Sequence, residues 1–346
     1  MRYIISIIIA ILIGWGVIFN AEETGDPGYK VNGVSLVSPS REVTSSHMDE
    51  LERVNADWVA IIPYAFAQSG EPSITFDHDR QWRGERTEGT IELIQLAKEQ
   101  GLKIMLKPHV WVRGEHWTGD FTLSDENKWK IWEKDFSNYI LHFARLADSL
   151  NVELLCIGTE YRIPAKERPD FWRKLIGEVR NNYSGKITYA SNWDNYMNIT
   201  WWDAVDYIGI DAYFPLVEEG VPSLEEIKDG WDPIKQDLKA FSNRWNKQIL
   251  FTEYGFQSAD GAAGNHWEID RSNALNNDQL QADAYEATFQ SLMDQSWYAG
   301  GFFWKWYFHQ RNPERYQTDW TPQGKLAEKV IAKWYGINNK KTTNQQ

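Results

Sequence analysis

Two glutamates each close an apolar run that is predicted to form a β-strand. Glu160 ends the run that begins at Val152, and Glu253 ends the run that begins at Gln248. A strand with so apolar an interior is expected to be buried on both faces, as in a parallel sheet. The carboxyl ends of such strands are where βα-barrel enzymes place their chemistry. Two carboxyl groups at that edge can supply a proton donor and a nucleophile, the pair that retaining glycoside hydrolases use.

The two glutamates are predicted to take different roles. Cleavage of a glycosidic bond needs a proton for the leaving oxygen and a nucleophile for the oxocarbenium-like carbon. We predict that Glu160 is the acid/base, because Tyr161 and other aromatic side chains should desolvate it and raise its pKa. Glu253 is predicted to be the ionised nucleophile, with Tyr213 as a candidate hydrogen-bond donor to it. The alternative is that each glutamate belongs to a structural ion pair, for Glu160 with Arg162 or Lys107.

The elements that must position this pair alternate along most of the chain. Eight apolar runs are predicted strands: 31–37, 58–63, 103–109, 153–160, 186–192, 206–213, 248–253 and 300–306. Helical patterns lie between them, among them 126–149, 170–183, 224–245 and 278–297. Eight strands, each followed by a helix, predict one α/β domain, a single (β/α)8 TIM barrel, with the ends of strands four and seven facing each other at ~5 Å across its mouth. A doubly wound open sheet is less favoured, since no Gly-rich phosphate loop follows the first strand.

The composition restricts the class of ligand. The net charge of −13 and the lack of a basic stripe argue against nucleic acid and disfavour a highly anionic glycan. Nineteen tryptophans exceed the expected packing need and favour sugar stacking over a merely aromatic core. The single cysteine, Cys156, cannot form an internal disulfide and is expected to be buried.

The chain is predicted to be exported. Residues 1–21 combine Arg2 with a continuous apolar stretch from 3 to 19, as expected of a signal peptide or an N-terminal membrane anchor. A spacer at 22–30, a catalytic domain at 31–337 and a polar tail at 338–346 follow. In either case the domain is expected to be extracytoplasmic: periplasmic, secreted or membrane-anchored through this segment only.

Five motifs occur in order along the predicted strands. They are Gly158-Thr-Glu160-Tyr161, Ser191-Asn192-Trp193-Asp194, Ile210-Asp211-Ala-Tyr213-Phe214, Thr252-Glu253-Tyr254-Gly255-Phe256 and Phe303-Trp304-Lys305-Trp306. Together they resemble glycoside hydrolase family 113, a clan A barrel family known for β-mannanase activity. The resemblance implies that Glu160 is the acid/base and Glu253 the nucleophile, and that the enzyme is retaining and needs no metal and no cofactor. It departs from the wider clan at Thr159, where Asn is usual, and Asn192 could supply the missing amide near the sugar 2-hydroxyl.

Further side chains are predicted to contact the substrate. Trp304 should form the floor beneath the reacting sugar, unless it packs inside the barrel. His109 should hydrogen-bond a sugar hydroxyl, unless it only supports a neighbour, and Asp211 should contact sugar or orient Lys305. The other candidates are Asn192, Trp193, Tyr213, Lys107, Tyr64 and Lys305, with the loop tryptophans Trp111, Trp117 and Trp267 as stacking surfaces. Lys107 and His109 lack a third ligand at metal-binding spacing, so no zinc site is predicted.

The predicted function is retaining cleavage of β-1,4-mannosidic bonds in mannan or glucomannan. The alternatives are an exo-acting β-mannosidase, another β-glycosidase or transglycosylase, and a catalytically inactive barrel that binds glycans. Both carboxylates argue against the last of these, because a pure binding protein needs neither of them at those strand ends.

Overall fold

The computed structural model describes residues 29–115, 117–218, 220–269, 273–309 and 313–343. The predicted export segment at 1–21 and most of the spacer lie outside these residues. Within the described ranges, no helix is both long and apolar enough to cross a membrane.

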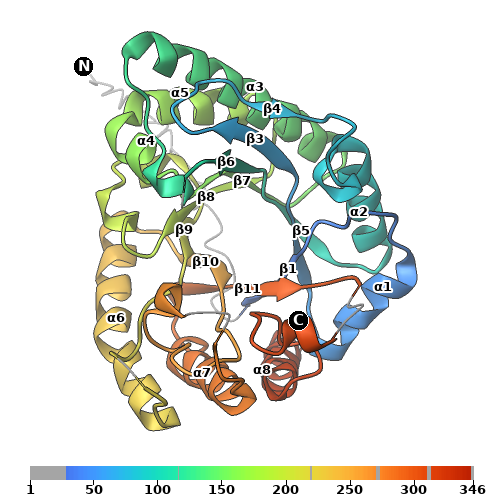
Figure 1. Ribbon diagram of the computed structural model, residues 1–346, viewed down its shortest axis with the longest axis vertical. Helices are drawn as coiled ribbons and strands as arrows, with labels where there is room; N and C mark the ends of the chain where they lie inside the picture. The colour runs from blue at the N-terminus through green and yellow to red at the C-terminus, as the bar shows by residue number, and fades with distance from the viewer. Residues whose placement is uncertain (1–28, 116, 219, 270–272, 310–312, 344–346) are drawn as a thin grey trace, which may run out of the picture.

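Eight parallel strands close into a barrel, which confirms the predicted (β/α)8 architecture (Figure 1). Their order around the barrel is β1-β11-β10-β9-β8-β7-β5-β2. The bounds are β1 Val31–Leu36, β2 Trp58–Ile61, β5 Lys103–Leu106, β7 Leu154–Thr159, β8 Lys186–Asn192, β9 Ile208–Asp211, β10 Ile249–Tyr254 and β11 Tyr298–Trp306. Small and apolar side chains such as Ala60, Met105 and Phe302 pack together in a core cluster of the strands. Cys156 is buried in the same cluster, as expected.

Helices surround the barrel in Figure 1 and bury their apolar faces against it. They are α1 Ser45–Asp49, α2 Thr87–Glu99, α3 Glu126–Ser149, α4 Arg162–Glu167, α5 Pro169–Arg180, α6 Leu224–Trp245, α7 Asp278–Leu292 and α8 Leu326–Thr343. The predicted bounds of α3 and α6 are confirmed, since strong caps set their first turns. The Asp125 carboxylate accepts from the amides of Asn127 and Lys128, both at 3.0 Å, and Ser223 forms a capping box with Glu226.

The prediction that every strand is followed by a helix is wrong between β8 and β9. That connection contains only two short 3-10 turns, Tyr196–Asn198 and Trp202–Ala204. Fully buried aromatic rings occupy the space instead: Trp201 stacks on Trp172 with ring centroids 5.2 Å apart, and Trp202 packs beside them. Among the described residues six tryptophans are fully buried, so part of the tryptophan content serves packing.

A second, three-stranded sheet stands next to the barrel mouth. It has the order β4-β3-β6, with β3 at Tyr64–Gln68, β4 at Thr75–Phe76 and β6 at His109–Arg113. The predicted strands 58–63 and 103–109 therefore end early, and the chain pairs again beyond them. Pro63 and Pro108 lie at the two breaks, and a proline has no N–H for a strand ladder.

The last helix extends into the predicted polar tail. α8 continues to Thr343, so residues 338–343 are helical. Asn338 is buried, and its amide donates to the carbonyl of Lys30 at 3.1 Å and to Oδ1 of Asn32 at 2.9 Å. These contacts lie at the N-terminal end of β1, away from the catalytic edge of the barrel.

Candidate active site

Glu160 follows β7 in a backbone conformation that is unusual for a glutamate. Its φ of 52° lies in the left-handed region, which costs a residue other than glycine about 1–3 kcal/mol. Two backbone hydrogen bonds hold it there: the Glu160 amide donates to Ala190 at 2.8 Å, and its carbonyl accepts from Arg162 at 2.8 Å. The chain therefore turns sharply at the end of β7.

Glu253 is positioned by an irregularity in β10. The register of β10 against β9 shifts between Phe251 and Glu253, and the pairing then resumes between Glu253 and Asp211. Such a bulge re-aims the side chains next to it. Only 8 % of the Glu253 side chain is exposed, and its carboxylate forms an ion pair with the ammonium of Lys107.

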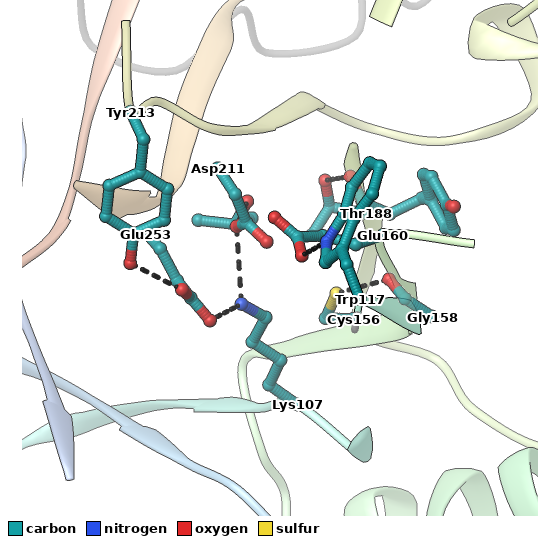
Figure 2. A network of polar contacts seen from close by, with 11 residues as sticks. Lys107, Trp117, Cys156, Gly158, Glu160, Thr188, Asp211, Tyr213 and Glu253 are labelled. Atoms are coloured by element: carbon teal, nitrogen blue, oxygen red, sulfur yellow. Dashed lines mark hydrogen bonds and ion pairs between the residues drawn. The ribbon is translucent and has the colours of Figure 1, made fainter. Parts of the chain in front are cut away.

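A buried lysine connects the carboxylates of β9 and β10. Lys107 directly follows β5. Its ammonium forms ion pairs with Oε1 of Glu253 and, at 3.3 Å, with Oδ1 of Asp211 (Figure 2). The side chains of Lys107 and Asp211 are fully buried. Tyr213 donates its hydroxyl proton to Oε2 of Glu253 at 2.7 Å, which confirms the predicted donor.

The charged groups of this cluster shift one another's pKa values. Burial would lower the pKa of Lys107, but the carboxylates of Asp211 and Glu253 outweigh it and raise that pKa, so the ammonium stays charged. Burial and then the charge of Glu253 raise the pKa of Asp211 well above its usual range, against the opposing effects of Lys107 and Thr252. One ammonium can balance one carboxylate, so Asp211 and Glu253 share a single buried cation.

Two predicted contacts of these residues are corrected. Asp211 does not orient Lys305: its Oδ1 accepts from Lys107 and, at 2.7 Å, from Thr252, while Oδ2 has no hydrogen-bond partner among the described residues. The alternative ion pairs of Glu160 are also wrong, because Lys107 pairs with Glu253 and Arg162 pairs with Asp120. Glu253 does form an ion pair, and that pair lies at the barrel mouth.

Glu160 lies in a different environment, although it is close enough to Glu253 to respond to its charge. Desolvation and then the charge of Glu253 raise the pKa of Glu160 to about 7. The indole N–H of Trp117 donates to Oε2 of Glu160 at 2.5 Å and lowers this pKa in part. The two glutamates thus lie in different environments: Glu160 has a neutral indole as its hydrogen-bond partner, and Glu253 has an ammonium.

Trp117 is the contact that the sequence prediction missed, because it was expected only to stack on sugar. Its ring lies on Gly119, where a Cβ would come within 2.3 Å of the indole. The guanidinium of Arg162 covers the ring at 4.9 Å. The sequence signal is the Trp-x-Gly spacing, which indicates a close approach without identifying the acceptor.

His109 and Tyr64 lie beside the cluster as a stacked pair, with ring centroids 5.2 Å apart and an interplanar angle of 14°. Burial and then the charge of Lys107 lower the pKa of His109 to about 4, so the imidazole is neutral at neutral pH. Its Nδ1 is buried and has no partner among the described residues. A neutral imidazole can exchange hydrogen bonds with a sugar hydroxyl, so the predicted role of His109 stays a prediction with a suitable geometry.

The remaining predicted residues surround the mouth. Trp304 is partly exposed on β11, and the ammonium of Lys305 lies 5.5 Å from the centre of its ring. Asn192 ends β8 and donates to Asp194 at 2.9 Å, and Trp193 stacks on Trp267 with ring centroids 5.8 Å apart. Substrate contact by these residues stays a prediction.

Metal ligands are not clustered in the described parts of the chain, where no three His, Cys, Asp or Glu side chains are placed to hold an ion. The side chains in direct contact with the two glutamates supply an ammonium from Lys107, a phenol from Tyr213 and an indole from Trp117.

The comparisons with known proteins agree with this geometry. A structure described as a GH113 β-1,4-mannanase complex has 27% sequence identity and a TM-score of 0.76, covering 89% of this chain and 99% of that one. The GH113 β-mannanase of Alicyclobacillus acidocaldarius, in complex with ManMIm, has 25% identity and a TM-score of 0.78, covering 90% and 98%. A Ruminococcus gnavus β-glucuronidase, at 13% identity and a TM-score of 0.61, covers 89% of this chain and 50% of its own and shows the fold alone. No curated protein matches.

The family comparison covers most of the chain. The sequence model for Glycoside Hydrolase Family 113 matches residues 38–325, which include every side chain of the carboxylate cluster and most of the barrel. The resemblance found in the five motifs is thereby confirmed: the chain is a glycoside hydrolase and belongs to glycoside hydrolase family 113.

Proposed function

We propose that the protein is a retaining β-mannanase that cleaves β-1,4-mannosidic bonds in mannan or glucomannan. The observation that carries the proposal is the division of the two carboxyl groups between two environments. Glu253 is paired with the buried Lys107 ammonium, while Glu160 has a pKa raised to about 7 and an indole as hydrogen-bond donor. The solved β-mannanases of this family support the choice of mannan.

In the first step, Glu160 gives its proton to the glycosidic oxygen while Glu253 attacks the anomeric carbon. The bond from that carbon to the leaving oxygen breaks, and a glycosyl ester of Glu253 forms. In the second step, the Glu160 carboxylate takes a proton from water, and the water oxygen replaces Glu253 at the same carbon. Two displacements return the original anomeric configuration.

The cluster around Glu253 supports both steps. Tyr213 and Lys107 contact the two oxygens of Glu253, which fixes the orientation of the carboxylate before attack. Formation of the ester removes the negative charge of Glu253 that pairs with Lys107. Hydrolysis of the ester in the second step restores that charge. The apolar N-terminal stretch from 3 to 19 supports action outside the cytoplasm.

Digestion of mannan, glucomannan, cellulose and xylan tests the function directly. We expect mixed-length oligosaccharides from mannan and glucomannan, and proton NMR of the first products should show the β-anomer before mutarotation. Release of mannose alone would favour the exo-acting alternative. The α-anomer as first product would contradict the retaining mechanism. Hydrolysis of cellulose or xylan, with mannan left intact, would contradict mannan as the substrate.

The pH profile tests the assignment of Glu160 through Trp117. Glu160 must be protonated to act, so kcat/KM should be retained below pH 7 and fall as the pH rises through the pKa of about 7. Trp117→Phe removes a donor that stabilises the carboxylate, so the alkaline limb should move to higher pH. The matched Trp267→Phe variant, which alters an exposed indole elsewhere, should leave the limb in place. An unmoved limb in Trp117→Phe would show that another group titrates there.

Replacement of Lys107 tests the buried ion pair. Lys107→Met leaves the Glu253 charge buried without a partner, which should cost about 3–5 kcal/mol of folding free energy. Glu253 should then take up a proton, with a loss of kcat of roughly 100-fold or more. Asp211→Asn keeps the acceptor oxygen for Lys107 and Thr252. This variant should therefore lose less folding free energy and less kcat than Lys107→Met. Denaturant unfolding and steady-state kinetics measure the two effects, and an equal loss in both variants would contradict the view that Lys107 acts mainly through its ion pair with Glu253.

A further inference from the structure

The small sheet beside the mouth has an outer face that packing does not explain. Burial alternates strictly along β3 and β6: Ala65, Ala67, Val110 and Val112 are buried, and the residues between them are not. A solvent-facing side of a sheet is normally polar. This one carries Tyr64, Phe66, Gln68, His109, Trp111 and Arg113, which we call the outer aromatic face.

This face begins at the active site. Parallel pairing places Tyr64 beside His109, Phe66 beside Trp111 and Gln68 beside Arg113. Tyr64 and His109 are close enough to Glu253 for its charge to affect their pKa values. The row therefore leads outward from the nucleophile in steps of two residues along each strand.

A groove follows the same row. Its inner part is a cavity of about 420 Å³, lined by Trp304 and Lys305 of β11 on one side and by Tyr64, Phe66 and Trp111 on the other. Its outer part, of about 780 Å³, shares Phe66, Trp82 and Arg113 with the inner part. Both volumes are typical of small-molecule sites, and together they extend the space above Trp304.

Two indoles border the groove with open faces. Trp82 is 53 % exposed and Trp111 59 % exposed, and neither contacts another aromatic ring among the described residues. In the same groove the Arg113 guanidinium lies 5.2 Å from the centre of the Phe66 ring. An exposed indole can stack on the C–H face of a sugar, and an arginine can donate to its hydroxyls.

The charges of the groove identify the chemistry of the occupant. The charged side chains that line the inner part are Arg113, Lys305 and Glu85, and in the outer part Arg80 and Arg113 face Glu71, Asp79 and Glu85. This mixture has no strong excess of one sign, so it suits a neutral polyhydroxylated chain better than a polyanion.

The position of the acid gives the direction of the chain. Glu160 follows β7, whereas the groove is lined by residues at the ends of β11 and β1 and by residues that follow β2 and β5. The acid protonates the oxygen of the leaving part, so that part departs on the Glu160 side. The groove then receives the sugars on the non-reducing side of the reacting one.

We propose that the outer aromatic face and Trp82 form additional subsites for a neutral β-linked oligosaccharide, on the non-reducing side of the sugar held over Trp304. The proposal rests on the proposed glycosidase function and adds the length and direction of the substrate that the enzyme holds.

The test uses Trp111→Ala and Trp82→Ala with mannotriose to mannohexaose labelled at the reducing end. On mannohexaose kcat/KM should fall roughly tenfold, the effect of one lost stacking contact, and the shortest oligosaccharide that is cleaved should be unaffected. Cleavage should also move toward the non-reducing end, as mass spectrometry of the products will show. Ile131→Ala, on the exposed side of α3, is the control for loss of an exposed apolar side chain.

Equal losses at all chain lengths, no loss, or a shift of cleavage toward the reducing end would overturn the proposal. A separate binding assay distinguishes this failure from failure of the mannanase function. Glu253→Gln is titrated calorimetrically with mannohexaose, cellohexaose and xylohexaose, with and without Trp111→Ala. If any hexaose binds and Trp111→Ala lowers its affinity about tenfold, the proposed subsites are supported, whichever glycan the enzyme cleaves. If none binds, or Trp111→Ala changes nothing, the subsites are refuted.

Discussion

The active site depends on one buried cation, the ammonium of Lys107. Desolvating a charge is expensive, and this one is retained because two carboxylates from neighbouring strands compensate for it. The consequence is a fixed arrangement of charge at the barrel mouth, in which one ammonium is shared between Glu253 and Asp211. A lysine at the end of β5 thus prepares a carboxylate at the end of β10, across strands that are far apart in the sequence.

The fold provides this arrangement through irregularities at the strand ends. The register shift in β10 re-aims Glu253, and the left-handed conformation of Glu160 turns its chain out of β7. Glu160 follows β7 and Glu253 lies within β10, and both strands are fully buried, so the deviations occur on rigid supports. The result is two carboxyl groups near each other, one paired with an ammonium and the other with an indole, which is what acid and nucleophile roles require.

Much of this could be predicted from the sequence. The apolar runs predicted the barrel, because parallel strands covered on both faces must be apolar throughout. The terminal glutamates and Tyr213 were predicted for the same reason: residues at the carboxyl ends of such strands converge on one mouth. Cys156 was predicted to be buried, since it lies within such a run.

The rest depended on contacts between distant segments. Lys107 was predicted near the site, but its pairing with Glu253 and Asp211 depends on the barrel closing. The small sheet was missed because Pro63 and Pro108 break two runs that otherwise read as continuous strands. Tryptophan composition was misleading, because it cannot separate the stacked, buried pair Trp172 and Trp201 from exposed rings such as Trp111.

Chemical rescue of Glu253→Gly with azide tests the central claim most directly. The space left by the carboxylate admits a small anion next to the Lys107 ammonium, and Glu160 can still protonate the leaving group. With an activated β-mannoside, the account predicts restored turnover and an α-mannosyl azide product. If azide restores no turnover and yields no such product although the variant is folded, Glu253 is not the nucleophile and the role assigned to Lys107 is wrong.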